Sequence, residues 1–295
     1  MTASPDVPAP DRPTRDLPAT ASTGRPSRAG RDLGSAIAVG LALGALILVP
    51  LLTVRQTFVG VLAAATAVAT WELRDAVRRG AGIEVPLPVL LVGGQAMIWL
   101  SWPFGLSGLA LSFVATALGC LVWRMRAGAA HYLRDVSVGL FTAVYVPLFC
   151  SFVVMLTVAP DGVGRVLTFM LCVVASDVGG YAVGVFAGKH PMAPSISPKK
   201  SWEGLGGSVV ACMAVATPII AFTFHRPWWG GLIIGAAIAA TATLGDLAES
   251  MIKRDLGIKD MGHLLPGLGG IMDRLDSLLP SAAVAFLLLS ALAPA

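Results

Sequence analysis

Apolar residues form long stretches along this chain, and short polar stretches separate them. The apolar stretches predict helices at about 35–54, 57–71, 86–101, 104–123, 136–158, 164–187, 205–224, 228–247 and 278–294. A helix needs about 20 mostly apolar residues to cross a bilayer, and these stretches approach or reach that length. A Trp-Pro-Phe break at 102–104 predicts a tight hairpin. The pattern therefore predicts an all-α, polytopic integral membrane protein with about nine transmembrane helices.

The composition supports a location in the membrane. The chain has 295 residues, of which 56% are hydrophobic and 13% are charged, and its mean hydropathy is +0.78. An ordinary soluble domain, with a charged fraction of about 25%, is therefore excluded. The cysteines lie inside apolar stretches without metal-site spacing, which predicts buried free thiols. They are Cys120, Cys150, Cys172 and Cys212.

Basic residues are distributed unevenly among the polar connections. Eighteen of the 21 Lys and Arg residues fall in five segments: the N-terminal tail, 72–85, 124–135, 188–204 and 248–277. Because positive charge is retained on the cytoplasmic side of a membrane during insertion, this split predicts nine spans in the cell membrane, with the N-terminus cytoplasmic and the C-terminus outside. Topology then accounts for the net charge of +4, and we expect no nucleic-acid partner.

The chain divides into three predicted parts. Residues 1–33 are rich in Pro, Arg, Ser, Thr and Asp, which predicts a disordered cytoplasmic tail. Residues 34–160 are expected to form N-terminal transmembrane helices, and residues 161–295 a catalytic transmembrane region. Two cytoplasmic loops of that region, 188–204 and 248–277, hold polar residues with candidate chemistry.

Acidic and basic side chains alternate in loop 248–277. Asp273 and Asp276 are three residues apart, which places them on one face if a helix begins near Gly270. With Asp246, at the end of the preceding span, they predict a Mg²⁺ site, since Mg²⁺ takes a few carboxylates together with phosphate oxygens and water. The alternative for these acids is a role at helix ends. The basic residues available for phosphate are Lys253, Arg254, Lys259 and Arg274.

Two further features indicate a polar site. The segment Pro266–Gly270 is glycine-rich and precedes Asp273, so its backbone N–H groups predict an anion-binding nest. Asp177 falls near the middle of the apolar stretch 166–186, where a charge costs about 2.5–3.5 kcal/mol. It therefore predicts a polar cavity, with a protonated structural Asp as the alternative.

Loop 188–204 is a second polar segment. Ser197, Lys199 and Lys200 predict phosphate contacts, and the alternative for the two lysines is a role in topology alone. Trp202 is amphipathic and is expected at the lipid interface. The remaining charges are interpreted as membrane-surface residues: Glu72, Arg74, Arg78, Arg79, Arg124, Arg126 and Arg134.

The longest motif in the chain resembles the signature of the phosphatidate cytidylyltransferase family, also called CDP-diacylglycerol synthases. It covers 27 residues, Ser250-x-Ile252-Lys253-Arg254-x4-Lys259-Asp260-x-Gly262-x2-Leu265-Pro266-Gly267-x-Gly269-Gly270-Ile271-x-Asp273-Arg274-Leu275-Asp276. Two upstream stretches agree with the same family, Ser176-Asp177 to Gly188-Lys189 and Ser197-Pro198-Lys199-Lys200-Ser201-Trp202-Glu203-Gly204. Leu268 departs from the pattern, because the family usually has His before the Gly-Gly pair.

The resemblance implies that CTP and phosphatidic acid react to give CDP-diacylglycerol and pyrophosphate, with Mg²⁺ required. It implies that Asp246, Asp273 and Asp276 hold the metal, that a second metal ion is an open option, and that Lys253 and Arg254 are also catalytic. Substrate binding would fall to Ser197, Lys199, Lys200, Trp202, Glu203, Lys259, Asp260, Gly269, Gly270, Arg274 and Asp177. The active site would face the cytoplasm, and a homodimer is an open option.

Three other functions compete with this one. A CTP-dependent polyprenol or other lipid kinase would use similar acids and a basic loop, but it would release CDP and leave no nucleotide on the lipid. A transporter or channel would spread essential polar groups through several spans, whereas here they gather near one face. A CDP-alcohol phosphotransferase would carry a DG-x2-AR spacing followed by two further aspartates, which this sequence lacks.

Overall fold

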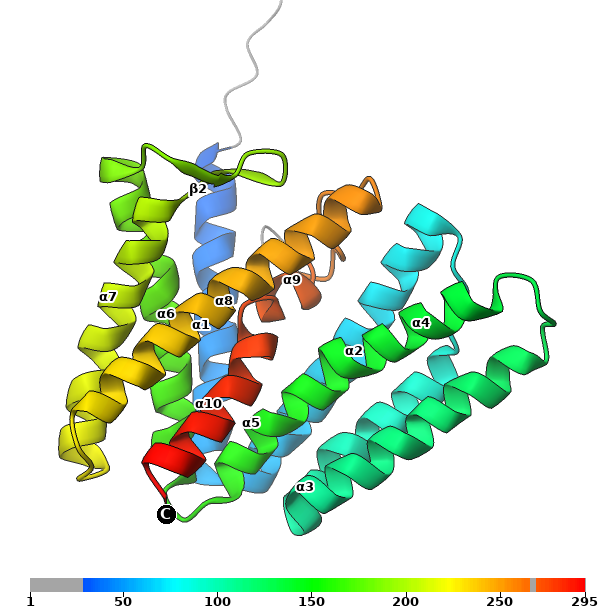
Figure 1. Ribbon diagram of the computed structural model, residues 1–295, viewed down its shortest axis with the longest axis horizontal. Helices are drawn as coiled ribbons and strands as arrows, with labels where there is room; N and C mark the ends of the chain where they lie inside the picture. Colours follow the sequence, from blue (N-terminus) through cyan, green and yellow to red (C-terminus); the bar gives the residue numbers. More distant parts are fainter. Residues whose placement is uncertain (1–28, 266–268, 295) are drawn as a thin grey trace, which may run out of the picture.

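The computed structural model describes residues 29–265 and 269–294, with side chains from residue 37 onward, and helices dominate it (Figure 1). The helices are α1 (Ala29–Thr53), α2 (Arg55–Ala81), α3 (Leu87–Met125), α4 (Tyr132–Ala143), α5 (Phe149–Val158), α6 (Gly162–Ala187), α7 (Trp202–Pro218), α8 (Trp229–Asp255), α9 (Met272–Leu275) and α10 (Leu278–Leu292). Two π-helical turns, η1 (Val144–Leu148) and η2 (Ile219–Thr223), continue α4 and α7.

The all-α prediction is confirmed, with one small addition. Loop 188–204 contains an antiparallel hairpin of β1 (Pro191–Ala193) and β2 (Ser197–Ser201). Within the described residues, seven helical stretches are long and apolar enough to cross a membrane: Arg55–Ala81, Leu87–Met125, Tyr132–Val158, Gly162–Ala187, Trp202–Thr223, Trp229–Asp255 and Met272–Leu292. A shorter apolar helix covers Ile37–Thr53. The protein is therefore a polytopic membrane protein, and nine crossings and their direction stay predictions.

Helix α3 is a pair of antiparallel arms. Gly105 interrupts it with a φ of 55° and a ψ of −134°, a conformation that only glycine adopts at low cost. The arms then pack so closely that a side chain at Gly93 would overlap Thr116. The sequence predicts a reversal at 102–104, and the structure has it at the next residue (Figure 1).

Glycines let α6, α7 and α8 approach one another. A Cβ at Gly180 of α6 would lie 2.5 Å from Ser208 Oγ of α7, and one at Gly235 of α8 would lie 2.7 Å from Cys212 C of α7. Such contacts between small residues are a common basis of helix association in membranes. In contrast, Gly40 and Gly44 have nothing within 4 Å of an added Cβ, so their four-residue spacing marks no such contact.

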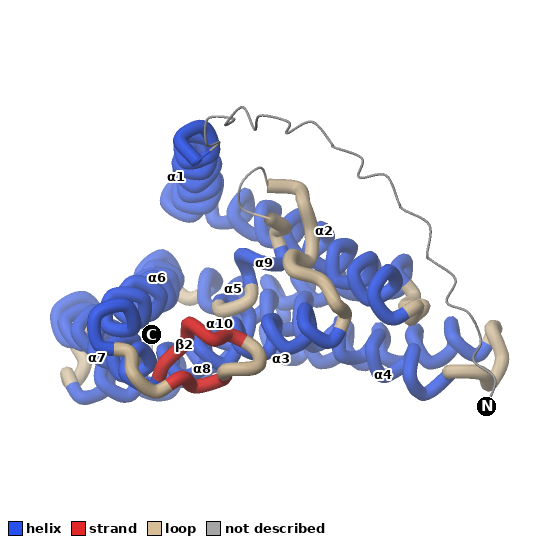
Figure 2. Tube along the Cα trace, turned by 90° about the horizontal axis from the view of Figure 1, so that it is seen from above, coloured by secondary structure: helices blue, strands red, loops and turns tan. Residues whose placement is uncertain are grey.

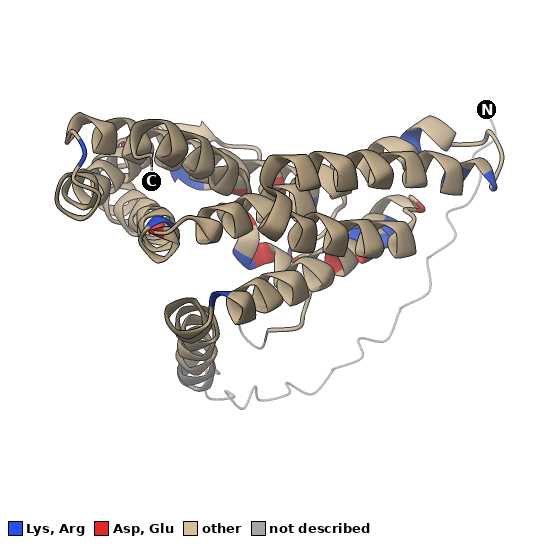
Figure 3. Cartoon of the chain, turned by 90° about the horizontal axis from the view of Figure 1, so that it is seen from below, with Lys and Arg blue, Asp and Glu red and all other residues tan. Residues whose placement is uncertain are grey.

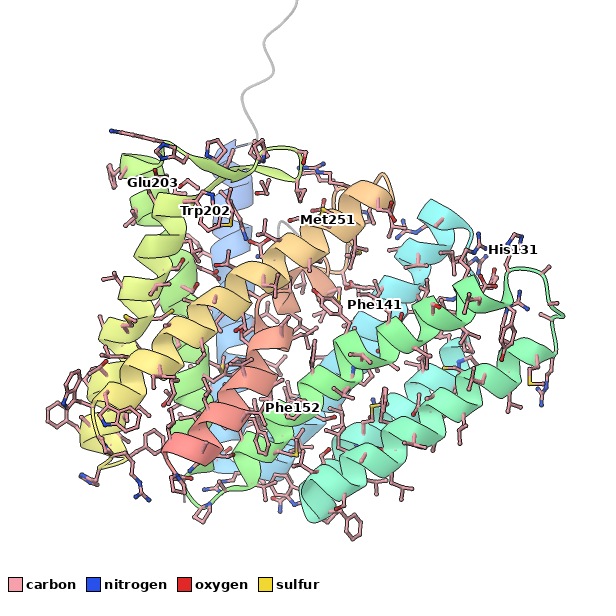
Figure 4. The ribbon with its side chains drawn as sticks, in the orientation of Figure 1. His131, Phe141, Phe152, Trp202, Glu203 and Met251 are labelled. Carbon is pink, nitrogen blue, oxygen red and sulfur yellow. The ribbon has the colours of Figure 1, made fainter. Side chains whose placement is uncertain are left out.

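Helices of the two predicted transmembrane regions pack against each other. Helix α5 lies against α10, where the rings of Phe152 and Phe286 pack at a tilt of 43° with centroids 5.6 Å apart; Figure 4 labels Phe152. Helix α2 contacts α9. The β-hairpin, α9 and the end of α8 lie at one end of the molecule (Figures 1 and 2). Residues from both regions therefore meet at that end, although the three-part division itself stays a prediction.

Helix α8 is longer than the sequence indicates. Its predicted end is at 247, but it runs to Asp255, so the segment that enters the site from α8 is helical. Hydropathy marks where a chain leaves the membrane, and a helix can continue beyond that point as long as its backbone hydrogen bonds continue. As a result Asp246, Glu249 and Lys253 are set on one rigid element at helical spacing.

Candidate active site

A cavity lies between the β-hairpin, the start of α7, the second half of α6 and the middle of α8. Its volume is about 270 Å³, and its charged lining residues are Asp177, Lys199, Lys200 and Asp246. The Lys200 Nζ atom is 2.5 Å from Asp246 Oδ2. Asp177 is exposed to this space, which agrees with the predicted polar cavity. The cavity thus brings together two acids and two lysines from three different elements.

Asp276 adjoins this group through the contact between α8 and α10. Gly245 packs so closely against Asp276 O that no side chain could fit at position 245. The carboxylates of Asp177, Asp246 and Asp276 are close enough to repel one another. The positive charges of Lys200 and Arg274 attract the carboxylate of Asp177 and offset part of this repulsion. Three acids therefore share one region of the site.

Asp273 is held in a network that reaches Asp276 through Lys253 and Glu249. Its Oδ1 atom accepts a hydrogen bond from Lys253 Nζ at 3.2 Å, and Met261 N donates to both carboxylate oxygens at 3.1 Å. Its Oδ2 atom also accepts from Gly270 N at 2.8 Å. Lys253 Nζ in turn lies 3.0 Å from Glu249 Oε2. Asp273 is 7% exposed, and both oxygens of its carboxylate accept hydrogen bonds inside the protein.

The three-residue spacing of Asp273 and Asp276 stays helical in the structure, because Asp276 and Ser277, which follow α9, have helical φ and ψ values. The hydrogen bonds of the two carboxylates nevertheless differ. Asp276 Oδ1 accepts from Ser277 N at 2.6 Å, whereas Asp273 binds the loop before it. Within residues 29–265 and 269–294, no group of three His, Cys, Asp or Glu is placed to hold a metal ion. The three-acid metal site stays a prediction.

The described part of the glycine-rich segment closes on itself. Leu265 N donates to Gly269 O at 2.8 Å, and Gly269 N donates to Leu265 O at 3.1 Å. Gly269 has a φ of +85°, which a residue with a side chain rarely adopts. Because the N–H groups of Gly269 and Gly270 are both in use, they form no open anion nest. The remaining residues of the predicted nest, 266–268, lie outside the described residues, as does the unusual Leu268.

The other predicted binding residues are not among those that line the cavity. Arg254 Nε is 3.5 Å from Ile196 O, which ties the end of α8 to the hairpin. Glu203 accepts hydrogen bonds from Lys189 N at 3.1 Å and His190 N at 3.2 Å. Figure 4 shows Glu203 and Trp202 at the start of α7. Of four further predicted residues, Ser197 is half-buried in β2, Lys259 and Arg274 are exposed, and Asp260 lies near Gly269.

Two acids of the site do not stand out in the sequence. Glu249 is fully buried beside Asp276 and Lys253. Glu72, interpreted above as a surface charge, is 1% exposed, and it accepts a hydrogen bond from Met272 N at 2.8 Å. Helical spacing carries a signal for Glu72, because buried residues flank it at positions 69 and 76 on α2.

The lining residues support one location for a divalent cation. Asp246 and Asp276 repel each other, and a cation between them would relieve that repulsion. Mg²⁺ needs few protein carboxylates when phosphate oxygens and water complete its shell, so the pair of Asp246 and Asp276 fits it. Asp273 fits it less well, because Lys253 and two backbone N–H groups already occupy its oxygens. Charged residues gather in few places on a mostly uncharged helical surface (Figure 3).

Comparison with known proteins assigns the chain to a family. The sequence model of the cytidylyltransferase family matches residues 34–292. The chain belongs to the cytidylyltransferase family. It is 49% identical to the phosphatidate cytidylyltransferase of Mycobacterium bovis over 96% of this chain and 95% of that protein. It is 47% identical to the protein of the same name from Mycobacterium leprae over 92% of each chain, and 36% identical to that of Haemophilus influenzae over 55% of this chain and 49% of that protein.

Family membership confirms the resemblance found in the motif. The match also covers the N-terminal half, where the sequence offers only hydropathy as a guide. This cytidylyltransferase is an enzyme with several apolar membrane helices, and its acids and lysines meet in a cavity between those helices and the β-hairpin.

Proposed function

We propose that this cytidylyltransferase transfers the cytidylyl group of CTP to phosphatidic acid, giving CDP-diacylglycerol and pyrophosphate for phospholipid synthesis. The observation that carries the proposal is its 49% identity, over nearly the whole length of both chains, to a phosphatidate cytidylyltransferase. The grouping of acids and lysines in one cavity supports it independently, because two anionic substrates need cations to meet.

The reaction requires little help from a general base. The phosphate monoester of phosphatidic acid carries about 1.5–2 negative charges at neutral pH, by analogy with phosphoserine. One of its oxygens forms a bond to the α-phosphorus of CTP, while the bond from that phosphorus to the bridging oxygen of pyrophosphate breaks. The main barriers are repulsion between the two anions and the charge that collects on pyrophosphate. Positioning and cationic side chains are what such a transfer demands.

The side chains divide these tasks between them. Lys199 and Lys200 line the cavity and neutralise substrate phosphates, and the positive charge of Arg274 also acts on Asp177. Lys200 also holds Asp246 in place through their ion pair. Lys253 holds Asp273 and so sets the loop that leads into Asp276. The cavity brings the reacting phosphates together and limits the water that could compete with the attacking oxygen.

Asp246 and Asp276 would hold Mg²⁺, with Asp177 beside them. The bound ion would supply positive charge to the phosphates of CTP. Asp273, which the sequence also predicts as a ligand, supports the arrangement from its own network in this proposal. Without an ion, the negative charges of Asp246 and Asp276 would repel the phosphates of CTP.

The proposed site opens at the cytoplasmic face of the cell membrane. The five segments that carry most of the basic residues would lie on that side, since positive charge is retained there. The acyl chains of phosphatidic acid would remain in lipid and reach the cavity sideways between helices. Trp202, which is 59% exposed at the start of α7, would lie at the interface. A homodimer enters no step of the proposal.

Purified full-length protein in lipid-detergent micelles, supplied with phosphatidic acid and cytidine-labelled CTP, tests the proposal. We expect labelled lipid and pyrophosphate in equal amounts, and loss of both with a chelator of divalent cations. Label that appears only in CDP would identify a lipid kinase instead. Activity that survives the chelator would contradict the metal assignment while leaving the transfer itself established.

A further inference from the structure

Glu72 lies on α2, far in sequence from the family motif, yet its carboxylate is buried against it. Its Oε2 atom accepts the hydrogen bond from Met272 N across 200 residues of chain. Met272 is the first residue of α9 and directly precedes Asp273. The other oxygen, Glu72 Oε1, has no hydrogen-bond partner in the part of the chain that the structure describes.

Two glycines make the space that this carboxylate occupies. A Cβ added at Gly270 would lie 2.6 Å from Glu72 Oε2 and 2.8 Å from Oε1. At Gly262, the three atoms nearest to an added Cβ are all atoms of Glu72. Gly270 also donates its N–H to Asp273 at 2.8 Å. The Glu72 carboxylate therefore lies between the two ends of segment 262–270.

A buried carboxylate is costly unless hydrogen bonds compensate for lost hydration. The Met272 N–H compensates in part, and it belongs to the turn from which Asp273 and Asp276 emerge. We infer that Glu72 is a positioning residue for cytidylyl transfer, which holds Gly262, Gly270 and Met272 in place and so fixes the turn from which Asp273 and Asp276 emerge. Its effect on turnover rests on the proposed function, whereas its effect on the segment does not.

Amide hydrogen exchange of the full-length protein tests the anchor without any assay of activity. In Glu72→Ala we expect peptides within 262–275 to exchange at least about tenfold faster, because local opening becomes easier, and peptides of α6 to stay unchanged. In Glu72→Gln, whose amide oxygen can accept the same N–H, we expect exchange within about threefold of the parent. Equal exchange in Glu72→Ala and the parent, or equally fast exchange in both variants, would overturn the inference.

Turnover is the second measurement. Glu72→Ala should lower kcat about 10- to 100-fold, because a displacement of about 1 Å in a site costs about that much, and Glu72→Gln should stay within about threefold. Glu84→Ala is the matched control, since Glu84 is an exposed carboxylate paired with Arg74 and Arg78. A parent protein without transferase activity would contradict the proposed function, and the exchange data would still decide the role of Glu72.

Gly262→Ala tests the contact even if Glu72→Ala folds poorly, and a double-mutant cycle of the two substitutions tests whether they are coupled. Gly262→Ala keeps Glu72 but places a methyl group into its carboxylate, so we expect a loss of at least about tenfold in kcat. In the Glu72→Ala background the same methyl should cost less than about threefold. Gly206→Ala is the control, because nothing lies within 4 Å of an added Cβ there. Losses that simply multiply would show that the two residues act independently and would overturn the inference.

Discussion

The acids near α8 have two kinds of surroundings. Toward the end of α8, Asp273 is buried and binds Lys253 together with backbone N–H groups. Earlier on α8, Asp246 faces a cavity together with Asp177, and Lys200 is paired with Asp246. The first arrangement satisfies its negative charge inside the protein. The second places acids and lysines on a cavity that a ligand can enter.

This difference separates two roles that the family motif joins in one string of residues. An acid whose hydrogen bonds are complete contributes mainly to structure, because a ligand would have to displace existing partners. Acids that repel one another carry unfavourable free energy in the folded protein, and a bound cation removes it. Substitutions of Asp273 should therefore lower stability, whereas substitutions of Asp246 or Asp276 should leave it unchanged or raise it. All of them should lower activity.

The largest loss of activity is expected for Asp276→Asn and Asp246→Asn. Each should lower turnover about 10³-fold or more, because loss of electrostatic stabilisation at a reacting phosphate has effects of that order. The melting temperature should stay the same or rise, since a repulsive charge is removed. Asp255→Asn, on the exposed end of α8, is the control. Near-parental turnover in either variant would remove that residue from the proposed metal site.

Asp273→Asn should lower both activity and stability. The amide keeps one acceptor oxygen but loses the charge that binds Lys253, and Lys253 is then left facing Glu249 alone. We expect a loss of about 1–3 kcal/mol in the free energy of unfolding and a decrease in turnover of about 10²-fold. Thermal unfolding in detergent and the CTP assay measure the two effects. An unchanged melting temperature would place Asp273 with the metal-binding acids.

Much of this fold can be predicted from the sequence because lipid imposes a simple rule. Long apolar stretches must be helices, since no water is present to satisfy their backbone groups. The same reasoning finds Asp177, whose charge is costly unless it meets a cavity. It also places the reversal of α3 within one residue of Gly105. These features depend on local sequence and on the solvent alone.

The features that sequence reasoning misses depend on contacts distant in the chain. Asp273 binds Met261 N and Gly270 N of the preceding loop, whereas Asp276 accepts from Ser277 N, and the spacing of the two acids cannot show this. Glu72 contacts Met272 across 200 residues of chain. Hydropathy indicates only that an apolar stretch ends at about residue 71. The hairpin formed by β1 and β2 is too short to show a clear alternation of polar and apolar residues.

Lys200→Met should have a smaller effect than the substitutions of the acids. It removes the ion pair with Asp246 and one cation from the cavity, so we expect turnover to fall about 10- to 100-fold, as for other charged contacts to phosphate. Lys199→Met is the matched comparison, because Lys199 lines the same cavity but is exposed and makes no ion pair among the described residues. Equal losses would indicate that both lysines act only through net charge.

Glu203→Gln should have the smallest effect, and it tests whether the edge of the site behaves like Asp273 or like Asp246. Glu203 lies 2.5 Å from His190 Nδ1 and accepts two backbone N–H groups, so its hydrogen bonds resemble those of Asp273. Because Gln keeps an acceptor oxygen, we expect turnover to fall about two- to fivefold and hydrogen exchange in β1 to increase slightly. If Glu203 contacts substrate instead, as the family motif predicts, KM for CTP should rise about tenfold or more with unchanged exchange.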